Sequence, residues 1–232
     1  MSDPEISHEE RLFLQESVDS DRPQLFALAH QVIARAIERR WDAVISDATR
    51  GILVGRFLAQ ILSAEAQSRG RSQPPLVHIA NSRHMYAGVL RNGFSEPSRG
   101  HSWAITNYLK PLGFERPLVA TDMVDSGKCL RKLGSAVVRA GMAPDFAILA
   151  TPRGLADVRR KIRAPRKSEI YAVTSGVEPM LAGDTVSQGL GVWSVYGKAE
   201  PQPSPYAWPW IGEVASQLYE QLADEYIGDR LA

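Results

Sequence analysis

Short apolar runs alternate with amphipathic stretches along the middle of the chain. Apolar residues recur at helical spacing over 52–62, about 128–140 and 154–163. Five runs before, between and after these stretches have the length and residue types of buried strands: 43–46, 76–80, 117–120, 146–150 and 170–173. Regular alternation of strand and helix predicts an α/β fold, with a doubly wound, mostly parallel sheet.

Amphipathic helices are also predicted at both ends of the chain. Residues 7–18 begin with a Ser-x-x-Glu capping box. A second helix is predicted to follow Asp21-Arg22-Pro23, because proline is favoured in the first turn of a helix. A last helix is predicted over 211–226. The chain is therefore divided into a helical N-terminal extension (1–40), an α/β core (41–197), and a Pro/Trp-rich segment with a C-terminal helix (198–232).

Two connections are longer than the others. Residues 81–116 are rich in Arg, Asn, Gly and Ser, and 199–210 are rich in Pro. Loops of this length inside a domain are usually functional. We expect 81–116 to be a flexible loop that closes over a site.

Composition and charge narrow the class of protein. The 232 residues are 44% hydrophobic and 23% charged, with a net charge of +1 and a single cysteine, which argues against disorder and a disulfide scaffold. No apolar run approaches the roughly 18 residues of a membrane span. We expect a cytoplasmic protein that binds neither membranes nor nucleic acid, and interpret the basic stretch 153–167 as a solvated helix surface.

The end of the third predicted strand carries the richest candidate chemistry. Ligands of open parallel sheets bind beyond the carboxyl ends of the strands. Here two carboxylates, Asp122 and Asp125, precede a small-residue turn and a helix N-terminus, whose free N–H groups favour phosphate. The segment is not a Walker A loop, since that motif requires a glycine five residues before Gly127, where Asp122 stands. The pattern predicts a site for a ribose phosphate.

This segment resembles the signature loop of type I phosphoribosyltransferases, which reads Glu-Asp-Ile-Ile-Asp-Thr-Gly-Lys-Thr in the purine branch. Asp122, Asp125, Gly127 and Lys128 are identical to that pattern. Three later segments are similar to the C-terminal half of uracil phosphoribosyltransferases: 148–155, 169–173 and 189–191. The resemblance covers about residues 40–197. It implies a type I phosphoribosyltransferase fold.

The resemblance also implies an activity and a first set of roles. The activity is transfer of a phosphoribosyl group from 5-phosphoribosyl 1-pyrophosphate to a nucleobase or related nitrogen heterocycle, with Mg²⁺ as cofactor. Asp122 would bind a ribose hydroxyl and the metal ion, and Asp125 would exchange a proton with the base. The 5′-phosphate would be wrapped by the segment that follows, made of Asp125, Ser126, Gly127, Lys128, Cys129 and Leu130.

The loop after the first strand matches the family's pyrophosphate loop. It runs from Asp47 through Thr49 and Arg50 to Gly51, and Arg50 would neutralise the pyrophosphate. Arg83 lies at the end of the second strand, where the family's catalytic loop begins. Asp125, Arg50 and the residues around them therefore form the candidate catalytic and substrate-binding set.

Departures from the family pattern leave a second function open. Thr121 replaces the first acidic residue of the signature, and Cys129 replaces a hydroxyl with a thiol, which is a weaker donor. A free cysteine usually packs as a small buried hydrophobe, as we expect of Cys129. The alternative is a protein of this fold that binds the pyrophosphorylated sugar or a nucleotide as a sensor, without turnover. The acceptor base is left open, and the Trp-rich and amphipathic ends predict a homodimer.

Overall fold

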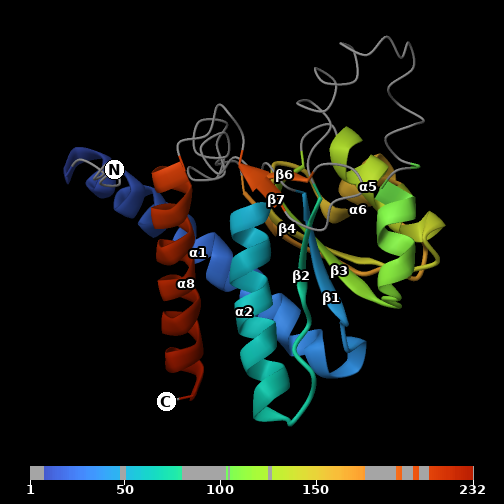
Figure 1. The fold of residues 1–232 in the computed structure, drawn as a ribbon, viewed down its shortest axis with the longest axis horizontal. Helices are drawn as coiled ribbons and strands as arrows, with labels where there is room; N and C mark the ends of the chain where they lie inside the picture. The colour runs from blue at the N-terminus through green and yellow to red at the C-terminus, as the bar shows by residue number, and fades with distance from the viewer. Residues whose placement is uncertain are drawn as a thin grey trace.

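A parallel sheet of five strands lies at the centre of the protein (Figure 1). The structure is a computed structural model and describes residues 8–47, 51–79, 103, 105–124, 127–175, 192–194, 201–203 and 209–231. In spatial order the strands are β2 (Leu76–Ile79), β1 (Ala43–Asp47), β3 (Pro117–Met123), β4 (Asp145–Thr151) and β5 (Ile170–Thr174). The five predicted strands are thereby confirmed.

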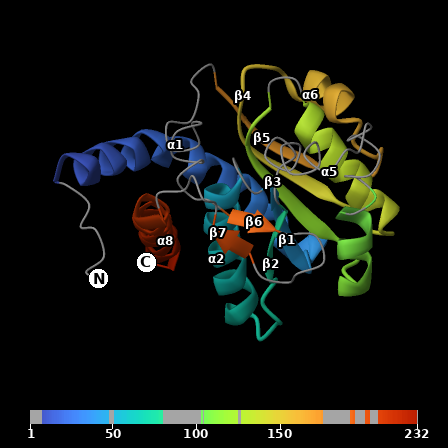
Figure 2. The ribbon, with the colours of Figure 1, turned by 45° about the horizontal axis from the view of Figure 1, so that its top comes forward.

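Helices cover both faces of this sheet (Figures 1 and 2). On one face lie α1 (His8–Arg39) and α2 (Ile52–Ser68), with α8 (Pro209–Leu231) packed against both. On the other face lie α5 (Lys128–Arg139) and α6 (Leu155–Ile162). Successive side chains of β3 point to opposite faces of the sheet. Leu118 and Ala120 pack in the core with α1, α2 and α8, whereas Val119 packs in the core with α5 and α6. The fold is therefore α/β and doubly wound, as predicted.

The terminal helices belong to the main core. Buried residues of α1 and α8, including Leu28 and Tyr219, form one apolar cluster with α2 and the sheet. Residues 1–40 and 198–232 were predicted as helical extensions of the α/β core. Their described helices cover one face of its sheet.

The prediction of two N-terminal helices is wrong, because α1 is one continuous helix that contains Pro23. A proline inside a helix loses a hydrogen bond and costs about 3 kcal/mol. Each fully buried leucine or valine returns about 1.5–3 kcal/mol. Apolar side chains on both sides of Pro23 lie on the same buried stripe and keep the helix unbroken: Leu14, Val18, Leu25 and Leu28.

The prediction of a loop over 81–116 is wrong for its last part. Residues 105–109 are helical and continue into a 3₁₀ turn, η1 (Lys110–Leu112). Ile105 and Leu109 are buried in the α5 and α6 core, which explains why this part is ordered. A short antiparallel pair, β6 (Val192–Ser194) and β7 (Pro201–Pro203), was not predicted.

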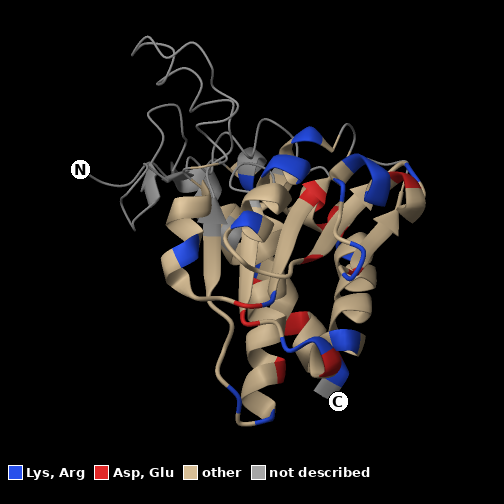
Figure 3. Cartoon of the chain, turned by 90° about the vertical axis from the view of Figure 1, so that its right-hand side faces the viewer, with Lys and Arg blue, Asp and Glu red and all other residues tan. Residues whose placement is uncertain are grey.

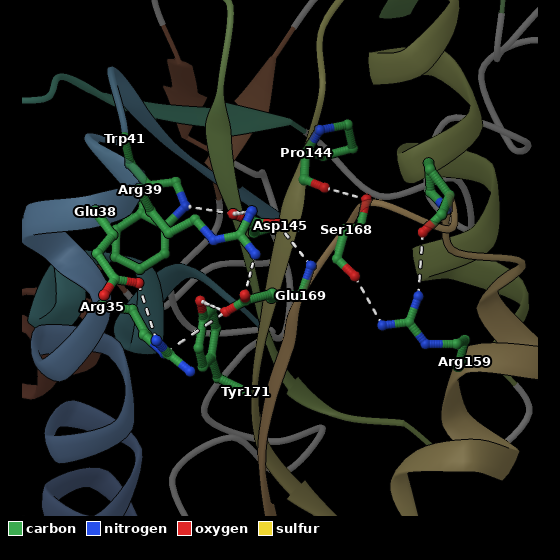
Figure 4. A network of polar contacts seen from close by, with 11 residues as sticks. Arg35, Glu38, Arg39, Trp41, Pro144, Asp145, Arg159, Ser168, Glu169 and Tyr171 are labelled. Atoms are coloured by element: carbon green, nitrogen blue, oxygen red, sulfur yellow. Dashed lines mark hydrogen bonds and ion pairs between the residues drawn. The ribbon is translucent and has the colours of Figure 1, made fainter.

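A buried polar network joins the end of α1 to the amino ends of β4 and β5 (Figure 4). The Asp145 carboxylate accepts hydrogen bonds from the Trp41 indole N–H at 3.0 Å and the Glu169 backbone N–H at 2.7 Å. Arg39 lies 3.7 Å from the same carboxylate and also pairs with Glu169. Hydrogen bonds from Arg39 and from the Tyr171 hydroxyl lower the pKa of Glu169. The network fixes α1 on the sheet.

Candidate functional site

The candidate site lies where the order of the strands reverses. From β1 the chain crosses to β2 on one side, and β3 pairs with β1 on the other side, with Ser46 opposite Ala120. In open parallel sheets this reversal opens a crevice at the carboxyl ends of the two central strands. The loops after β1 and β3 both begin there, so the topology brings the end of β1, Gly51, and residues 122–124 and 127–130 to the same edge of the sheet.

Both helices that follow these loops begin with a glycine cap. Gly51 precedes α2 and Gly127 precedes α5, so no side chain at either cap position hydrogen-bonds the first N–H groups. The two helices lie on opposite faces of the sheet, with their N-termini at the same edge (Figure 1). Neither has an acidic residue in its first turn. Two positive helix ends therefore flank the reversal point, an arrangement that favours an anion.

Gly127 has a conformation and a packing position that require glycine. Its φ is +68°, in the left-handed region, and a Cβ at this position would lie 3.0 Å from the Lys161 Cβ and 3.3 Å from the Lys161 backbone carbon of α6. The α5 N-terminus thus lies directly against α6. This close approach sets the direction in which the first N–H groups of α5 point.

Gly127→Ala should lower the free energy of unfolding by about 2–3 kcal/mol, as the left-handed strain of about 1–2 kcal/mol adds to the overpacking against α6. Gly113→Ala is the matched control, since Gly113 has φ +71° and nothing within 4 Å of the added Cβ. Urea denaturation should show a loss about 1 kcal/mol smaller for Gly113→Ala. Equal losses for the two variants would disprove the close contact with α6.

Asp122 lies in the interior at the end of β3. Asp122 is 1% exposed, and its Oδ1 accepts a hydrogen bond from the Thr121 hydroxyl at 3.3 Å. Thr121 is also buried. Because alternate side chains of a strand point to the same face, Asp122 lies on the same face as Leu118 and Ala120, which is covered by α1, α2 and α8. The carboxylate therefore points toward the layer that contains the terminal helices.

A second buried acid lies near Asp122 in that layer. The Tyr219 hydroxyl of α8 donates a hydrogen bond to the Asp21 Oδ2 of α1 at 3.1 Å, and both residues are buried. Burial raises the pKa of Tyr219, and the charges of Asp21 and Asp122 raise it further. Asp21, Asp122 and Tyr219, which we call the interior acid cluster, connect the candidate site to both terminal helices.

Asp21 and Tyr219 were not among the site residues predicted from the sequence. The signal was present in α1, because Ser17 and Asp21 lie at helical spacing on the same stripe as Val18, Leu25 and Leu28. Polar residues on a buried stripe need hydrogen-bond partners in the tertiary structure.

The first turn of α5 is basic and exposed. Lys128 and Cys129 are exposed, and Leu130 is buried in the core. The expectation of a buried Cys129 is wrong, because the buried stripe of α5 runs through Leu130, Leu133 and Val137 and leaves position 129 beside it. A lysine at a helix N-terminus opposes the helix dipole. Figure 3, which faces α5 and α6, shows basic residues toward the upper end of this layer.

Several candidate residues lie outside the described residues. These are Thr49, Arg50, Arg83, Asp125 and Ser126, and of Asp47 only the backbone at the end of β1 is described. Their roles stay predictions from the resemblance. The described members of the candidate set lie at the reversal point: Gly51 and the residues of 121–124 and 127–130.

The basic stretch 153–167 is partly engaged in local contacts. Arg153 and Arg160 pair with Asp157, at 3.5 Å and 2.5 Å, and lower its pKa. Arg159 donates to the backbone oxygens of Pro165 and Ser168 at 3.1 Å and 2.7 Å (Figure 4). These contacts agree with the interpretation of a solvated helix surface.

The sequence matches no protein-family model and no characterised protein sequence. Within the described ranges, no three His, Cys, Asp or Glu side chains gather as a metal site. None of the described helices has the length and apolarity of a membrane span. The geometry of the reversal point therefore carries the functional argument.

Proposed function

We propose that this protein has the type I phosphoribosyltransferase fold and transfers a phosphoribosyl group from 5-phosphoribosyl 1-pyrophosphate to a nucleobase or related nitrogen heterocycle. The observation that carries the proposal is the pair of glycine-capped helix N-termini, after Gly51 and Gly127, at the reversal point of the sheet. The substrate carries phosphate at two ends of its ribose. Two positive helix ends at one crevice suit such a molecule.

In this proposal each of the two helix N-termini binds one phosphate-bearing end of the substrate. The N–H groups at the start of α5, with the charge of Lys128, would hold the 5′-phosphate. The N-terminus of α2 would hold the pyrophosphate. In the transfer, the bond from ribose C1 to the pyrophosphate oxygen breaks, a bond from C1 to the acceptor nitrogen forms, and the acceptor loses a proton. Fixed charges at both ends position the ribose and stabilise the leaving group.

Mg²⁺ fits this site as an ion bound mainly by the substrate. Proteins often hold Mg²⁺ through one or two carboxylates together with substrate phosphates. Asp122, at the end of β3, would supply one carboxylate to the ion. When bound, the ion would neutralise charge that develops on the pyrophosphate.

One observation favours the alternative, a sensor that binds the same ligand without turnover. Thr121 is buried and donates its hydroxyl to Asp122, so it supplies no second carboxylate to the ribose. Binding needs only the phosphate sites, whereas turnover also needs a carboxylate arrangement that distinguishes the transition state. Release of pyrophosphate separates the two functions.

Calorimetric titration with 5-phosphoribosyl 1-pyrophosphate and Mg²⁺ tests the shared binding site. We expect saturable heat with the natural protein and an affinity about fivefold weaker for Lys128→Ala, because one charge at the phosphate end is lost. Lys110→Ala is the control: this exposed lysine belongs to η1 and is expected to leave the affinity unchanged.

Absence of binding to the natural protein would rule out both the transferase and the sensor. Where binding is present, pyrophosphate release is measured with a panel of purines, pyrimidines and related nitrogen heterocycles. Release with one of these bases supports the transferase. Binding with no release across the panel supports the sensor and contradicts the transferase.

A further inference from the structure

A pocket of about 240 Å³ lies at the amino edge of the sheet, opposite the reversal-point site. This open pocket is lined by the last turn of α1, the C-terminal half of α2 and the turn that leads to β2. This turn lies at the bottom of Figures 1 and 3, where Figure 3 marks basic residues. The volume corresponds to about eight waters, which is room for one small ring with a polar group.

The pocket combines an apolar wall with three arginines. The apolar lining residues are Ala36, Ile37, Trp41, Leu62, Ala66 and Pro74. Arg40, Arg69 and Arg71 line it as well. A site with an apolar wall and few polar groups is typical of a small organic ligand.

Hydrogen bonds and ion pairs already engage both acids of the pocket. The Asp42 carboxylate accepts the backbone N–H groups of Glu115 and Arg116, at 2.5 Å and 3.1 Å. Glu65 pairs with Arg69 at 2.7 Å and lies 3.9 Å from Arg230. The acids therefore hold the walls in place.

The guanidinium groups of Arg40 and Arg71 are available to bind a ligand. Neither Arg40 nor Arg71 forms a side-chain hydrogen bond or ion pair with any residue in the described ranges, and both are exposed. Three arginines against two acids leave a local charge of +1. The C-terminal ends of α1 and α2 add partial negative charge, so a monoanion suits the pocket better than a dianion.

The backbone at Arg40 supports a role for its side chain. Arg40 follows the last residue of α1 with φ +48°, in the left-handed region that helix ends usually assign to glycine. Its backbone N–H still closes the helix on Ala36 at 3.1 Å. Glycine would serve the turn with less strain, but it would remove the guanidinium from the pocket.

We propose that this pocket binds a small organic monocarboxylate with an apolar body about the size of one ring, whose carboxylate is held by Arg40 and Arg71 and whose ring lies against Trp41. Planar guanidiniums bind carboxylates through paired N–H groups. The site lies at the opposite edge of the sheet from the phosphoribosyl site, and the proposal stands independently of that function.

Benzoate is the probe, and benzamide is its neutral counterpart of the same shape. Binding is followed by the NMR signal of the Trp41 indole N–H, assigned with Trp41→Phe. We expect benzoate to shift this signal saturably, with a Kd of about 1 mM or lower, as is common for well-placed ligands of this size. Benzamide should bind at least tenfold more weakly.

Two arginine variants separate ligand binding from helix termination. Arg40→Gly should weaken benzoate at least fivefold, while its thermal midpoint rises by about 2 °C because left-handed strain is relieved. Arg163→Gly is the matched control, since Arg163 ends α6 with φ +54° and does not line the pocket. It should show the same direction of midpoint change with unaltered benzoate affinity.

Three outcomes overturn the proposal. The first is no saturable shift of the Trp41 signal with benzoate up to about 10 mM. The second is equal affinity for benzoate and benzamide, which would make the pocket merely apolar. The third is unaltered benzoate affinity in Arg40→Gly.

Discussion

Asp145→Ala should lower the free energy of unfolding by about 3–5 kcal/mol, the loss expected when one partner of a buried charged network is removed. The Asp145 side chain is 2% exposed, and its carboxylate accepts the Trp41 indole and the Glu169 backbone N–H groups. Truncation leaves these donors and the Arg39 guanidinium without that acceptor in the interior. Denaturation by urea, followed by far-UV circular dichroism, measures the change.

Glu38→Ala is the control for Asp145→Ala. Glu38 pairs with Arg35 at 2.9 Å on the outer side of α1, but its side chain is 66% exposed. Pairs of this kind contribute about 0–1 kcal/mol. A loss for Asp145→Ala no larger than that for Glu38→Ala would contradict the role of Asp145 in fixing α1 on the sheet.

Asp122→Asn should weaken binding of 5-phosphoribosyl 1-pyrophosphate with Mg²⁺ by at least tenfold, if the carboxylate binds the ribose and the ion as the proposed function requires. Hydrogen bonds to a charged group contribute about 1.5–3 kcal/mol, which corresponds to this change in affinity. The amide keeps the size of the side chain and can still accept the hydrogen bond from Thr121. Calorimetry gives the affinity, and urea denaturation measures the accompanying change in the free energy of unfolding.

Tyr219→Phe, also in the interior acid cluster, is the control for Asp122→Asn. It removes the hydroxyl that donates to Asp21 and should cost about 1–3 kcal/mol of stability, while the ligand affinity changes less than twofold. The reverse pattern would contradict a ligand role for Asp122: natural affinity in Asp122→Asn together with a large loss of stability. Asp122 would then be a structural member of the interior acid cluster.

The two predictions act at opposite edges of the same sheet. Asp145 lies at the amino end of β4, where the chain anchors α1, and Asp122 lies at the carboxyl end of β3, at the reversal point. A loss of stability from the first and a loss of affinity from the second would separate the support of the fold from the binding of the ligand.

The alternation of strands and helices could be read from the sequence because each element buries its own apolar residues. Strands such as 117–120 and 146–150 are short apolar runs between amphipathic helices, and a parallel sheet follows from that order. The turn at Gly127 could also be read, since a glycine between a strand and a helix marks a change of backbone direction.

Other features depended on packing between distant segments. Pro23 indicates a helix start by local preference, but burial of Leu14 and Leu25 on one stripe keeps α1 continuous. Asp21 meets Tyr219 across nearly the whole chain, and no local pattern specifies that pair. The same holds for Cys129, whose exposure depends on which side of α5 faces the sheet.

By itself the sequence determined the doubly wound α/β class and the candidate segment 121–130, because secondary structure and turn chemistry are written in neighbouring residues. Only the tertiary structure decided that the loops after β1 and β3 begin at one reversal point, that both terminal helices cover one face, and that Asp122 lies near Tyr219. These features depend on strand order and on contacts between residues far apart in the chain, for which single-chain periodicity carries no signal.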